Sequence, residues 1–368
     1  MIRVLQVLGA LVLGGAESRV MDIYRSLDRT KCEFDFVTMK EGTQYYEAEI
    51  EALGGKIYRI GFPRKVGIIK NLNDIRKCIR EGKYDAVHAH TSYHCGVVML
   101  AAWLEKVPVR IAHARTTGSR QEGVKKKVAK VLGQILINAF STKNIAISTA
   151  AGDYLFGKGD FEVVPNAIDV SKFQKTDNTE LRRYHQEFGI IDNALVVGHI
   201  GRFDDMKNHR FVLECFRSFH EGNPASVLLL IGDGELKEQM VTYSQSLGID
   251  TNVRFLGERD DVPKLIHLFD VMLFPSKFEG LGGVVIEAQA AGIPTVVSDM
   301  VPIETDMGIG LVKRCSLSDD LQTWVNTMKE SIKKEVVDYG TINRALVAHG
   351  YDLKTVTEKY QRLYEGEE

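Results

Sequence analysis

The chain of 368 residues lacks the sequence features of membrane-spanning, secreted and zinc-stabilised proteins. Its longest apolar run, 96–104, is about half as long as a transmembrane helix, so no segment is expected to cross a bilayer. The start of the chain predicts a strand followed by a glycine turn, and we expect no cleavable signal. The five cysteines are scattered and form no C-x-x-C pair, which favours a reducing cytoplasm without a structural zinc site.

Two common nucleotide-binding motifs are also missing. The segment 8–18 follows the first expected strand, but it is not G-x-G-x-x-G, and Ala16 stands where a P-loop has lysine. A kinase or a Rossmann dehydrogenase is therefore disfavoured. The pair Gly14 and Gly15 can still let backbone amides approach a phosphate closely, and an ordinary tight turn is an equal alternative.

Net charge is close to balanced, at −2, but it is distributed unevenly. Residues 1–170 carry 25 Lys and Arg against 18 Asp and Glu, and the remainder is acidic. A basic N-terminal half suggests contact with phosphate groups or a membrane surface, although chance distribution of solvated charges gives the same count. We expect no nucleic-acid partner.

Short apolar segments alternate with amphipathic helical stretches along the whole chain. The apolar content of 44% is ordinary, and the length exceeds what one core usually supports. Near-continuous Val, Ile and Leu runs between helices predict parallel sheets buried on both faces, and hence two doubly wound α/β domains. The expected strands are 2–8, 33–39, 56–60, 84–90, 107–114 and 144–148, followed by 194–201, 226–232, 252–257, 270–276 and 293–299.

The boundary between the two domains is expected near 163–173, where a Pro-Asn turn precedes a polar stretch. We place the domains at 1–168 and 169–350. A final segment, 351–368, contains Val356, Tyr360, Leu363 and Tyr364 at helical spacing, which predicts a helix that packs back on the first domain.

Two motifs of the second domain follow expected strands, at the edge of a parallel sheet where ligands bind. Arg202 and Lys207 straddle a short loop and could grip a diphosphate, with solvated surface charge as the alternative. Farther on, Gly282 and Gly283 are expected to open a helix whose free amides favour an anion. Glu279 and Glu287 bracket these glycines, and about 12 Å would separate them if the whole segment were helical.

The block "EGLGGVVIEAQAAGIPTVVSD" resembles the E-x7-E signature of the retaining glycosyltransferases of family 4, which have the GT-B fold. The segments "GRF…KN", "VPNAIDVSKF" and "FLGERDDV" are similar to the same family in order and spacing. The resemblance implies two Rossmann-like domains facing across a cleft, with the acceptor on 1–168 and the nucleotide sugar on 169–350. It also implies transfer of a hexosyl or N-acetylhexosaminyl group with retention.

The resemblance further implies roles for single residues. Glu287 would bind the ribose, Glu279 the donor sugar, and Arg202 with Lys207 the diphosphate. The remaining implied contacts are amides of Gly282, Gly283 and Val284 on phosphate and sugar, Gly257 and Arg259 near the base, Gly14 and Gly15 on the diphosphate from the first domain, and His113 on the donor sugar.

Histidines cluster in "HAHTSYH", where His88, His90 and His94 could suggest a metal. No acidic residue completes a ligand set, and the resemblance implies no metal there, so we interpret them as strand-end residues of the acceptor cleft. For His113, a structural histidine with satisfied hydrogen bonds is the alternative. The basic stretch 123–138 predicts an amphipathic helix that either lies on an anionic bilayer or packs within its domain.

A departing nucleoside diphosphate needs its negative charge stabilised, by a metal or by fixed cations and a helix dipole. No D-x-D triplet occurs in the chain, so we expect a metal-independent reaction without a cofactor. The resemblance implies front-face transfer from a UDP-sugar donor to a glycan or lipid-linked acceptor in surface polysaccharide assembly. Peripheral contact with the inner face of the cell membrane is one option.

The alternative function is a non-catalytic sugar-nucleotide-binding subunit or sensor with the same fold. Phosphorolysis and sugar-nucleotide epimerisation are disfavoured, because phosphorylases need a longer chain with a cofactor lysine and epimerases lack the E-x7-E block. The segment 281–283 departs from many relatives, which carry a bulky residue or proline there. The diglycine should loosen the hold on the donor sugar and leave the nucleotide site intact.

Overall fold

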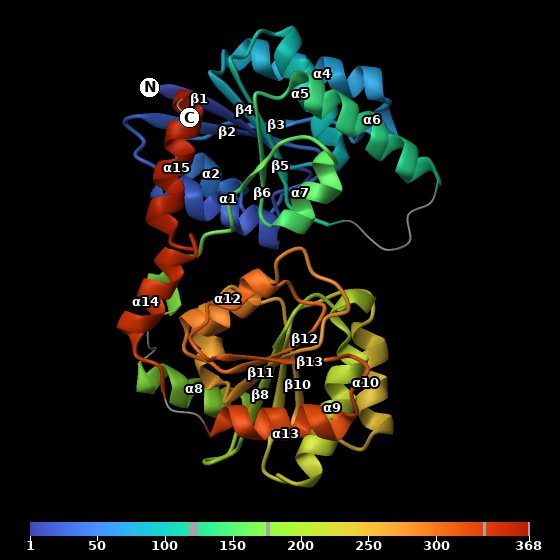
Figure 1. Ribbon diagram of the computed structural model, residues 1–368, viewed down its shortest axis with the longest axis vertical. Helices are drawn as coiled ribbons and strands as arrows, with labels where there is room; N and C mark the ends of the chain where they lie inside the picture. Colours follow the sequence, from blue (N-terminus) through green and yellow to red (C-terminus); the bar gives the residue numbers. More distant parts are fainter. Residues whose placement is uncertain (118–123, 174–176, 334–335, 367–368) are drawn as a thin grey trace. The chain divides into compact units, whose positions relative to one another are not determined.

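The protein is described by a computed structural model that covers residues 1–117, 124–173, 177–333 and 336–366, with only the backbone at 124–126. The chain forms two compact units (Figure 1). The first combines Met1–Ile168 with Gly350–Glu368, and the second is Asp169–His349. The first unit is therefore built from both ends of the polypeptide.

The first unit contains a parallel sheet of seven strands in the order β3-β2-β1-β4-β5-β6-β7. Helices cover both faces: α5 packs against α4 and α6, whereas α1 packs against α15. The strands are β1 Ile2–Val7, β2 Cys32–Thr38, β3 Ile57–Arg59, β4 Ala86–Ala89, β5 Val109–Ala114, β6 Lys143–Ala146 and β7 Glu162–Val163. The helices are α1 Gly15–Ser26, α2 Glu47–Ala52, α3 Pro63–Val66, α4 Ile68–Gly82, η1 Ser92–His94, α5 Cys95–Leu104, α6 Val124–Phe140, α7 Thr149–Phe156 and α15 Leu353–Glu365.

The last helix, α15, belongs to the core of the first unit. Asp352 caps it by accepting a hydrogen bond from the Thr355 amide at 2.9 Å, which satisfies one of the free amides of the first turn. The apolar face predicted from the sequence is buried in one cluster with β1, β2 and α1. The Tyr364 ring meets Phe34 edge to face at 5.6 Å, so the end of the chain packs beside its second strand.

The second unit contains a parallel sheet of six strands in the order β10-β9-β8-β11-β12-β13. Its strands are β8 Val196–Ile200, β9 Val227–Ile231, β10 Val253–Gly257, β11 Val271–Phe274, β12 Thr295–Ser298 and β13 Val312–Cys315. Its helices are η2 Val170–Phe173, α8 Asn178–Phe188, η3 Asp205–Lys207, α9 His209–Glu221, α10 Lys237–Ser246, η4 Asp250–Asn252, α11 Val262–Leu265, η5 Ile266–Leu268, α12 Gly283–Ala290, η6 Ile303–Thr305, α13 Leu321–Ile332 and α14 Tyr339–Ala348.

The expected fold class, two doubly wound parallel sheets, is confirmed. Two strands were not among the expected segments. Strand β7 has only two residues, both exposed, and β13 carries Lys313 and Arg314 in its middle. Both lie at sheet edges, where one side of the strand is free of neighbours, so neither needs the continuous apolar run of a central strand.

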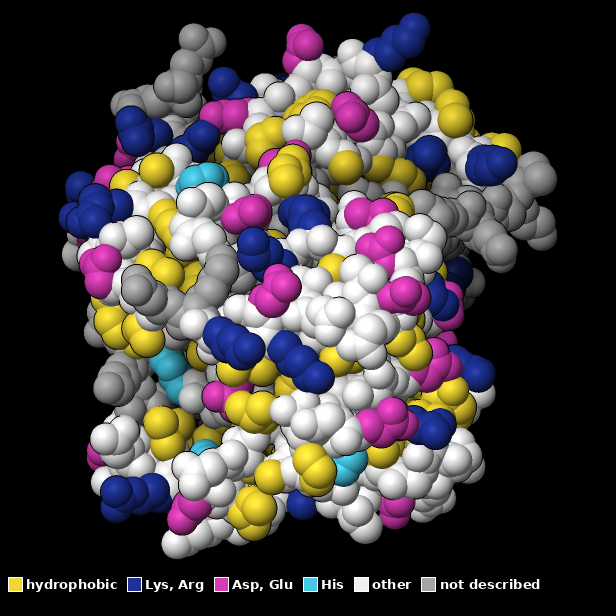
Figure 2. Space-filling model, turned by 60° about the horizontal axis from the view of Figure 1, so that its bottom comes forward, with side chains coloured by type: hydrophobic (Ala, Val, Ile, Leu, Met, Phe, Trp, Pro, Cys, Tyr) yellow, Lys and Arg dark blue, Asp and Glu magenta, His cyan; other side chains and the backbone are white. Residues whose placement is uncertain are grey.

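The topology brings the predicted site residues to the carboxyl ends of central strands. In the first unit the strand order reverses between β1 and β4, and in the second between β8 and β11. Ligands of doubly wound sheets bind at this reversal, because the following loops diverge to opposite faces. On the face shown in Figure 2, basic and acidic side chains are interspersed over most of the surface. None of the described helices combines the length and apolar character needed to cross a bilayer.

Candidate functional site

Two loops of the second unit, one after β8 and one after β11, are joined by backbone-directed hydrogen bonds. The Asn208 side-chain amide donates to the Pro275 carbonyl at 3.1 Å, and the Lys277 amide donates to the Met206 carbonyl at 2.8 Å. Asn208 adopts a left-handed conformation (φ 58°), which ends η3 and starts α9. These two hydrogen bonds between the loops fix the position of Lys207, the last residue of η3.

Lys207 and Glu279 form an ion pair in which Nζ lies 2.5 Å from Oε1. Both side chains are largely buried, with exposed fractions of 21% and 10%. The ammonium also lies 4.9 Å from the centre of the Phe274 ring, a cation–π distance. The structure thus brings together two residues predicted separately, and holds the lysine by a carboxylate and an aromatic face.

Arg202 lies at the rim of the same loop and is mostly exposed, at 77%. Its Nε donates to Asp204 Oδ2 at 2.8 Å, while Asp204 Oδ1 accepts from the Lys207 amide at 3.2 Å. Asp204 was not singled out in the sequence. Its carboxylate binds the guanidinium of Arg202 and the backbone amide of Lys207. An incoming anion would therefore compete with Asp204 for the Arg202 side chain but not for the Lys207 ammonium.

The predicted helix start at the glycines is where α12 begins. Gly282 is its N-cap with φ 83° and offers no side chain to the first turn. This left-handed conformation, and not crowding, explains why the residue is glycine. A Cβ on Gly282 would meet neighbours only at 3.5 Å and beyond. A Cβ on Gly283 would meet nothing within 4 Å. The amides of Gly283 and Val284 belong to the first turn of α12, where amides have no partner within the helix and lie at the positive end of its dipole.

Glu287 lies one turn into α12 and is 8% exposed. The alternative of a solvent-facing helix carboxylate does not hold for this residue. Glu279, by contrast, precedes the helix, so the 12 Å spacing expected for a continuous helix does not apply between the two glutamates.

Gly257 and Arg259 lie at β10, two strands away from β8 at the edge of the sheet. Gly257 has φ 72° and accepts a hydrogen bond from the Gly232 amide at 2.8 Å. Arg259 is held by Asp261 through bonds of 2.8 and 2.6 Å, which raise its pKa, and it lies over Phe188. The structure therefore does not bring Arg259 to the Lys207 pair, and an ion pair already occupies its guanidinium.

In the first unit, Gly14 and Gly15 lie at the start of α1, and Gly15 is the first residue of the helix. Gly14 caps α1 with an ordinary extended φ of −131°. A Cβ on Gly14 would meet the Glu17 carboxylate at 2.6 Å, whereas one on Gly15 would meet nothing within 4 Å. Burial raises the pKa of Glu17, and the Arg115 charge opposes that rise. A side chain at Gly14 would therefore require the flexible Glu17 carboxylate to move, whereas the Gly15 position has room for one.

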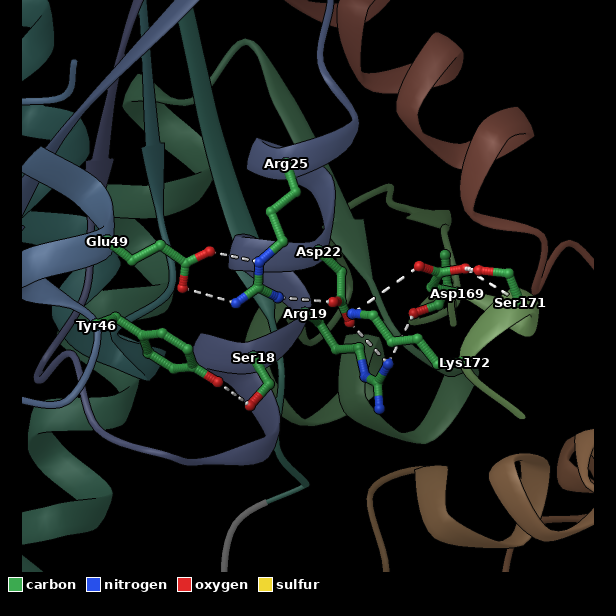
Figure 3. Close-up of polar contacts among 10 residues, drawn as sticks. Ser18, Arg19, Asp22, Arg25, Tyr46, Glu49, Asp169, Ser171 and Lys172 are labelled. Carbon is green, nitrogen blue, oxygen red and sulfur yellow. Dashed lines mark hydrogen bonds and ion pairs between the residues drawn. The ribbon is translucent and has the colours of Figure 1, made fainter. Parts of the chain in front are cut away.

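Helix α1 is fastened at its side by polar contacts (Figure 3). Arg25 forms a two-bond pair with Glu49 at 2.6 and 2.8 Å and also binds Asp22 at 3.0 Å. One turn before Asp22, the Ser18 and Tyr46 hydroxyls lie 2.7 Å apart. These contacts set the position of the helix start that carries the glycines.

His113 is the second-last residue of β5 and is fully buried. Its Nδ1 is 3.1 Å from His88 Nε2, whereas no described residue forms a hydrogen bond with its Nε2. Burial first, and the Arg115 charge second, hold the pKa of His113 well below its usual value. The alternative of a structural histidine with both nitrogens satisfied is therefore not what the structure shows.

The histidine grouping differs from the one that the sequence suggested. Nitrogens of His88, His90 and His113 lie within 4.8 Å of one another. His94 is apart from them, bound to Asn71 at 2.8 Å and to Thr91. The Arg115 guanidinium lies 2.9 Å from His90 Nδ1, and a fixed positive charge at this distance disfavours a cation in the cluster.

Comparisons with known proteins identify the family of the chain. Residues 13–172 match the family described as "Glycosyltransferase Family 4", and residues 181–308 match "Glycosyl transferases group 1". A Bacillus subtilis protein named as the glycosyltransferase EpsF is 34% identical over 95% of this chain and 93% of its own. The Staphylococcus aureus capsular polysaccharide biosynthesis glycosyltransferase CapH is 25% identical over 99% of both chains.

A third relative is the Escherichia coli UDP-Gal:alpha-D-GlcNAc-diphosphoundecaprenol alpha-1,3-galactosyltransferase, 24% identical over 96% of this chain and 94% of its own. Among solved structures, Anabaena HepE in complex with UDP and glucose has a TM-score of 0.81 at 20% identity over 100% of both chains. WaaG, a glycosyltransferase of lipopolysaccharide biosynthesis, has a TM-score of 0.71 at 15% identity over 99% of this chain and 100% of its own. These likenesses establish the GT-B fold.

Proposed function

Because the chain belongs to the glycosyltransferases of family 4, we propose that it transfers a sugar from a nucleoside diphosphate donor with retention of configuration and without a divalent metal. The observation that carries this proposal is the buried Lys207–Glu279 pair in the unit that also holds the uncapped start of α12. An enzyme is favoured over a non-catalytic sensor, since the relatives are named as glycosyltransferases.

The leaving group of this reaction is a nucleoside diphosphate whose charge grows as the bond to the sugar breaks. After β8, Lys207 supplies a fixed cation and Arg202 a second, mostly exposed one, and the Gly283 and Val284 amides supply a helix terminus after β11. Fixed charges of this kind stabilise a developing anion without reorganisation, which is the role that a metal plays in other transferases. Glu279 and Phe274 hold the lysine in place, so its charge is preorganised.

Retention is proposed to follow front-face departure and attack. Glu279 is engaged by Lys207 at 2.5 Å, a contact that suits a carboxylate orienting a cation rather than one attacking a sugar carbon. Mass spectrometry of the protein after incubation with a slow donor analogue tests this step. A sugar covalently attached to an active-site side chain would overturn front-face transfer.

The donor is proposed to be a UDP-sugar, and the acceptor a glycan or a lipid-linked glycan. The names of two relatives support this choice: HepE was solved with UDP-glucose, and the Escherichia coli relative uses UDP-Gal on a diphosphoundecaprenol-linked sugar. CapH and WaaG act in capsule and lipopolysaccharide biosynthesis, which supports a place in surface polysaccharide assembly.

The site is tested by comparing Lys207→Ala with Lys277→Ala. Lys277 lies in the same pair of hydrogen-bonded loops, but its side chain is 42% exposed and is paired with Asp205, so it serves as the matched control. We expect Lys207→Ala to reduce UDP release from UDP-glucose by about 100-fold, the effect of removing one preorganised charge, and Lys277→Ala to leave it unchanged. Calorimetry with UDP should show weaker binding for Glu287→Ala. Equal turnover in the two lysine variants would refute the site.

The exposed side of α6 supports a proposal about location. Val128, Val131, Leu132 and Ile135 recur at helical spacing and are between 51% and 58% exposed, while Ile137 faces the core. Lys127 is exposed beside this stripe, and the side chains of Lys125 and Lys126 lie outside the described residues. We propose that this stripe contacts an anionic membrane surface from the cytoplasmic side, because an apolar face bordered by lysines matches that surface.

Vesicle sedimentation tests the membrane contact. The protein should pellet with vesicles that contain phosphatidylglycerol and remain in solution with phosphatidylcholine alone. Replacing Leu132 and Ile135 by Gln should abolish pelleting without changing UDP affinity. Equal pelleting of the variant, or no pelleting of the parent protein, would contradict the proposal.

A further inference from the structure

The first unit contains a chain of hydrogen bonds that links Arg115 to His113 through the last helix. It runs through side chains of three strands or their ends, β1, β4 and β5, and of α15, all within one unit. The links, in order, are Arg115 Nε to His90 Nδ1 at 2.9 Å, His90 Nε2 to Gln6 Oε1 at 2.9 Å, Gln6 Nε2 to Tyr364 Oη at 3.1 Å, Tyr364 Oη to His88 Nδ1 at 2.8 Å and His88 Nε2 to His113 Nδ1 at 3.1 Å.

The direction of donation along this chain of hydrogen bonds is set at its first link. A guanidinium can only donate, so His90 Nδ1 must accept from Arg115 and carries no hydrogen. A neutral imidazole then has its hydrogen on Nε2, which donates to Gln6 Oε1. This contact also fixes the orientation of the Gln6 amide, because the opposite orientation would place two N–H groups against each other.

The Gln6 side-chain amide sets the direction of donation at the next hydrogen bond, which joins it to Tyr364. The Tyr364 oxygen accepts from Gln6 Nε2, and among the described residues His88 Nδ1 is the acceptor available to its hydroxyl hydrogen. If His88 donated instead, this buried hydroxyl would keep an unpaired hydrogen, which costs about 1–3 kcal/mol. Tyr364 therefore donates, and His88 carries its hydrogen on Nε2.

The last link fixes the tautomer of His113. His88 Nε2 donates to His113 Nδ1, and the planes of the two rings are parallel within 9°, with centres 5.2 Å apart. His113 therefore carries its hydrogen on Nε2. That nitrogen is buried, and its hydrogen has no acceptor among the described residues.

Charge and burial agree with a chain of neutral rings. Burial is the main cause that holds the pKa of His88, His90 and His113 well below the usual value, and Arg115 adds to it in each case. A metal would have to displace the shared hydrogen between His88 and His113 while facing the Arg115 charge. The hydrogen-bond chain accounts for each ring nitrogen except the free donor.

We propose that Tyr364 and Gln6 are positioning residues that hold His113 as an Nε2–H donor, so that it gives a hydrogen bond to an oxygen of the bound substrate and cannot accept a proton from it. This role rests on the proposed glycosyl transfer for its ligand, but the tautomer itself is a property of the free protein. The closing helix of the chain thereby determines the chemical form of a residue at the end of β5.

The first test reads the tautomer directly. Histidine labelled with nitrogen-15 gives distinct NMR signals for protonated and bare ring nitrogens, and loss of one set in His113→Gln identifies the residue. We expect Nε2 protonated and Nδ1 bare in the ligand-free protein, and a mixture of both tautomers in Tyr364→Phe. The matched control is Tyr360→Phe, which removes a hydroxyl from the same buried face of α15 where no described residue bonds it.

A second variant should reverse the direction of donation along these hydrogen bonds. Gln6→Glu keeps the acceptor for His90 but has no hydrogen for Tyr364, so the hydroxyl turns to the carboxylate and His88 donates from Nδ1. His113 should then show Nδ1 protonated and Nε2 bare. A His113 tautomer that is the same in the parent protein, Tyr364→Phe and Gln6→Glu, or Nδ1 protonated in the parent protein, would overturn the proposal.

Turnover provides the functional readout. UDP release from UDP-glucose should fall roughly five- to tenfold in kcat in Tyr364→Phe, the effect of one lost neutral hydrogen bond, with Tyr360→Phe unchanged and UDP affinity equal in both. Circular dichroism and thermal unfolding verify that both variants fold. An inactive parent protein with the expected tautomer would contradict the transferase assignment and leave the positioning intact. Active variants of equal kcat would contradict the positioning alone.

Discussion

Acid should destabilise the second unit through His209, and the size of the effect follows from its surroundings. The ring is 2% exposed, stacks on Phe203 with centres 3.9 Å apart, and lies near the Lys207 charge. Burial first, and that charge second, lower its pKa from 6.5 to about 4. Its neutral form therefore contributes stability that is complete above pH 6.5 and is lost as the pH falls toward 4.

The perturbation is His209→Phe, which keeps a ring on Phe203 and cannot bind a proton. Proton linkage predicts that the lowered pKa of His209 reduces the free energy of unfolding by about 2 kcal/mol between pH 7 and pH 5. The variant should lose about 2 kcal/mol less than the parent protein over that interval. An exposed histidine of the same unit, His349, serves as the control position, and His349→Phe should leave the loss unchanged.

Urea unfolding at the two pH values measures the difference. Trp324 is buried in the second unit and Trp103 lies in the first, so a Trp103→Phe background lets fluorescence follow the second unit alone. Separate observation is needed because a protein of two units need not unfold in one step. If His209→Phe and its parent lose the same free energy between pH 7 and pH 5, the assigned burial of a neutral ring is refuted.

Two further predictions concern backbone and packing. Gly282→Ala should cost about 1–2 kcal/mol and reduce turnover, because φ 83° strains any residue with a Cβ, whereas Gly283→Ala should fold as the parent does; equal unfolding midpoints for the two variants would contradict this. Leu363→Ala should cost about 2–5 kcal/mol in unfolding of the first unit, because Leu363 is 5% exposed in its core, and the exposed Lys354→Ala is the control; an unchanged midpoint would show that α15 is not part of that core.

The sequence was sufficient for the class of fold and for most strands, because central parallel strands are buried on both faces and need continuous apolar runs. It failed at β7 and β13, which lie at edges where charged residues such as Lys313 are tolerated. The start of α12 was predicted well, since two glycines after an apolar strand signal a turn that leads into a helix.

The candidate site was only partly predictable, because its contacts join distant segments. Lys207 and Glu279 were each predicted, but they are 72 residues apart, and nothing in either motif indicates that they bind each other. The bond between Gln6 and Tyr364 spans 358 residues. Arg259 was predicted near the base from its position in a motif, and only the structure shows that Asp261 holds it.

The division of the first unit between both ends of the chain affects how the protein is made. About 180 residues of the second unit are synthesised between the two parts, which takes on the order of 10–40 s at ribosomal rates. During that interval the sheet of the first unit lacks α15, and the apolar surface of β1, β2 and α1 is exposed to chaperones and proteases. The nascent second unit can complete its own sheet during this interval. The first unit, whose synthesis begins earlier, is then completed later, when α15 packs on it.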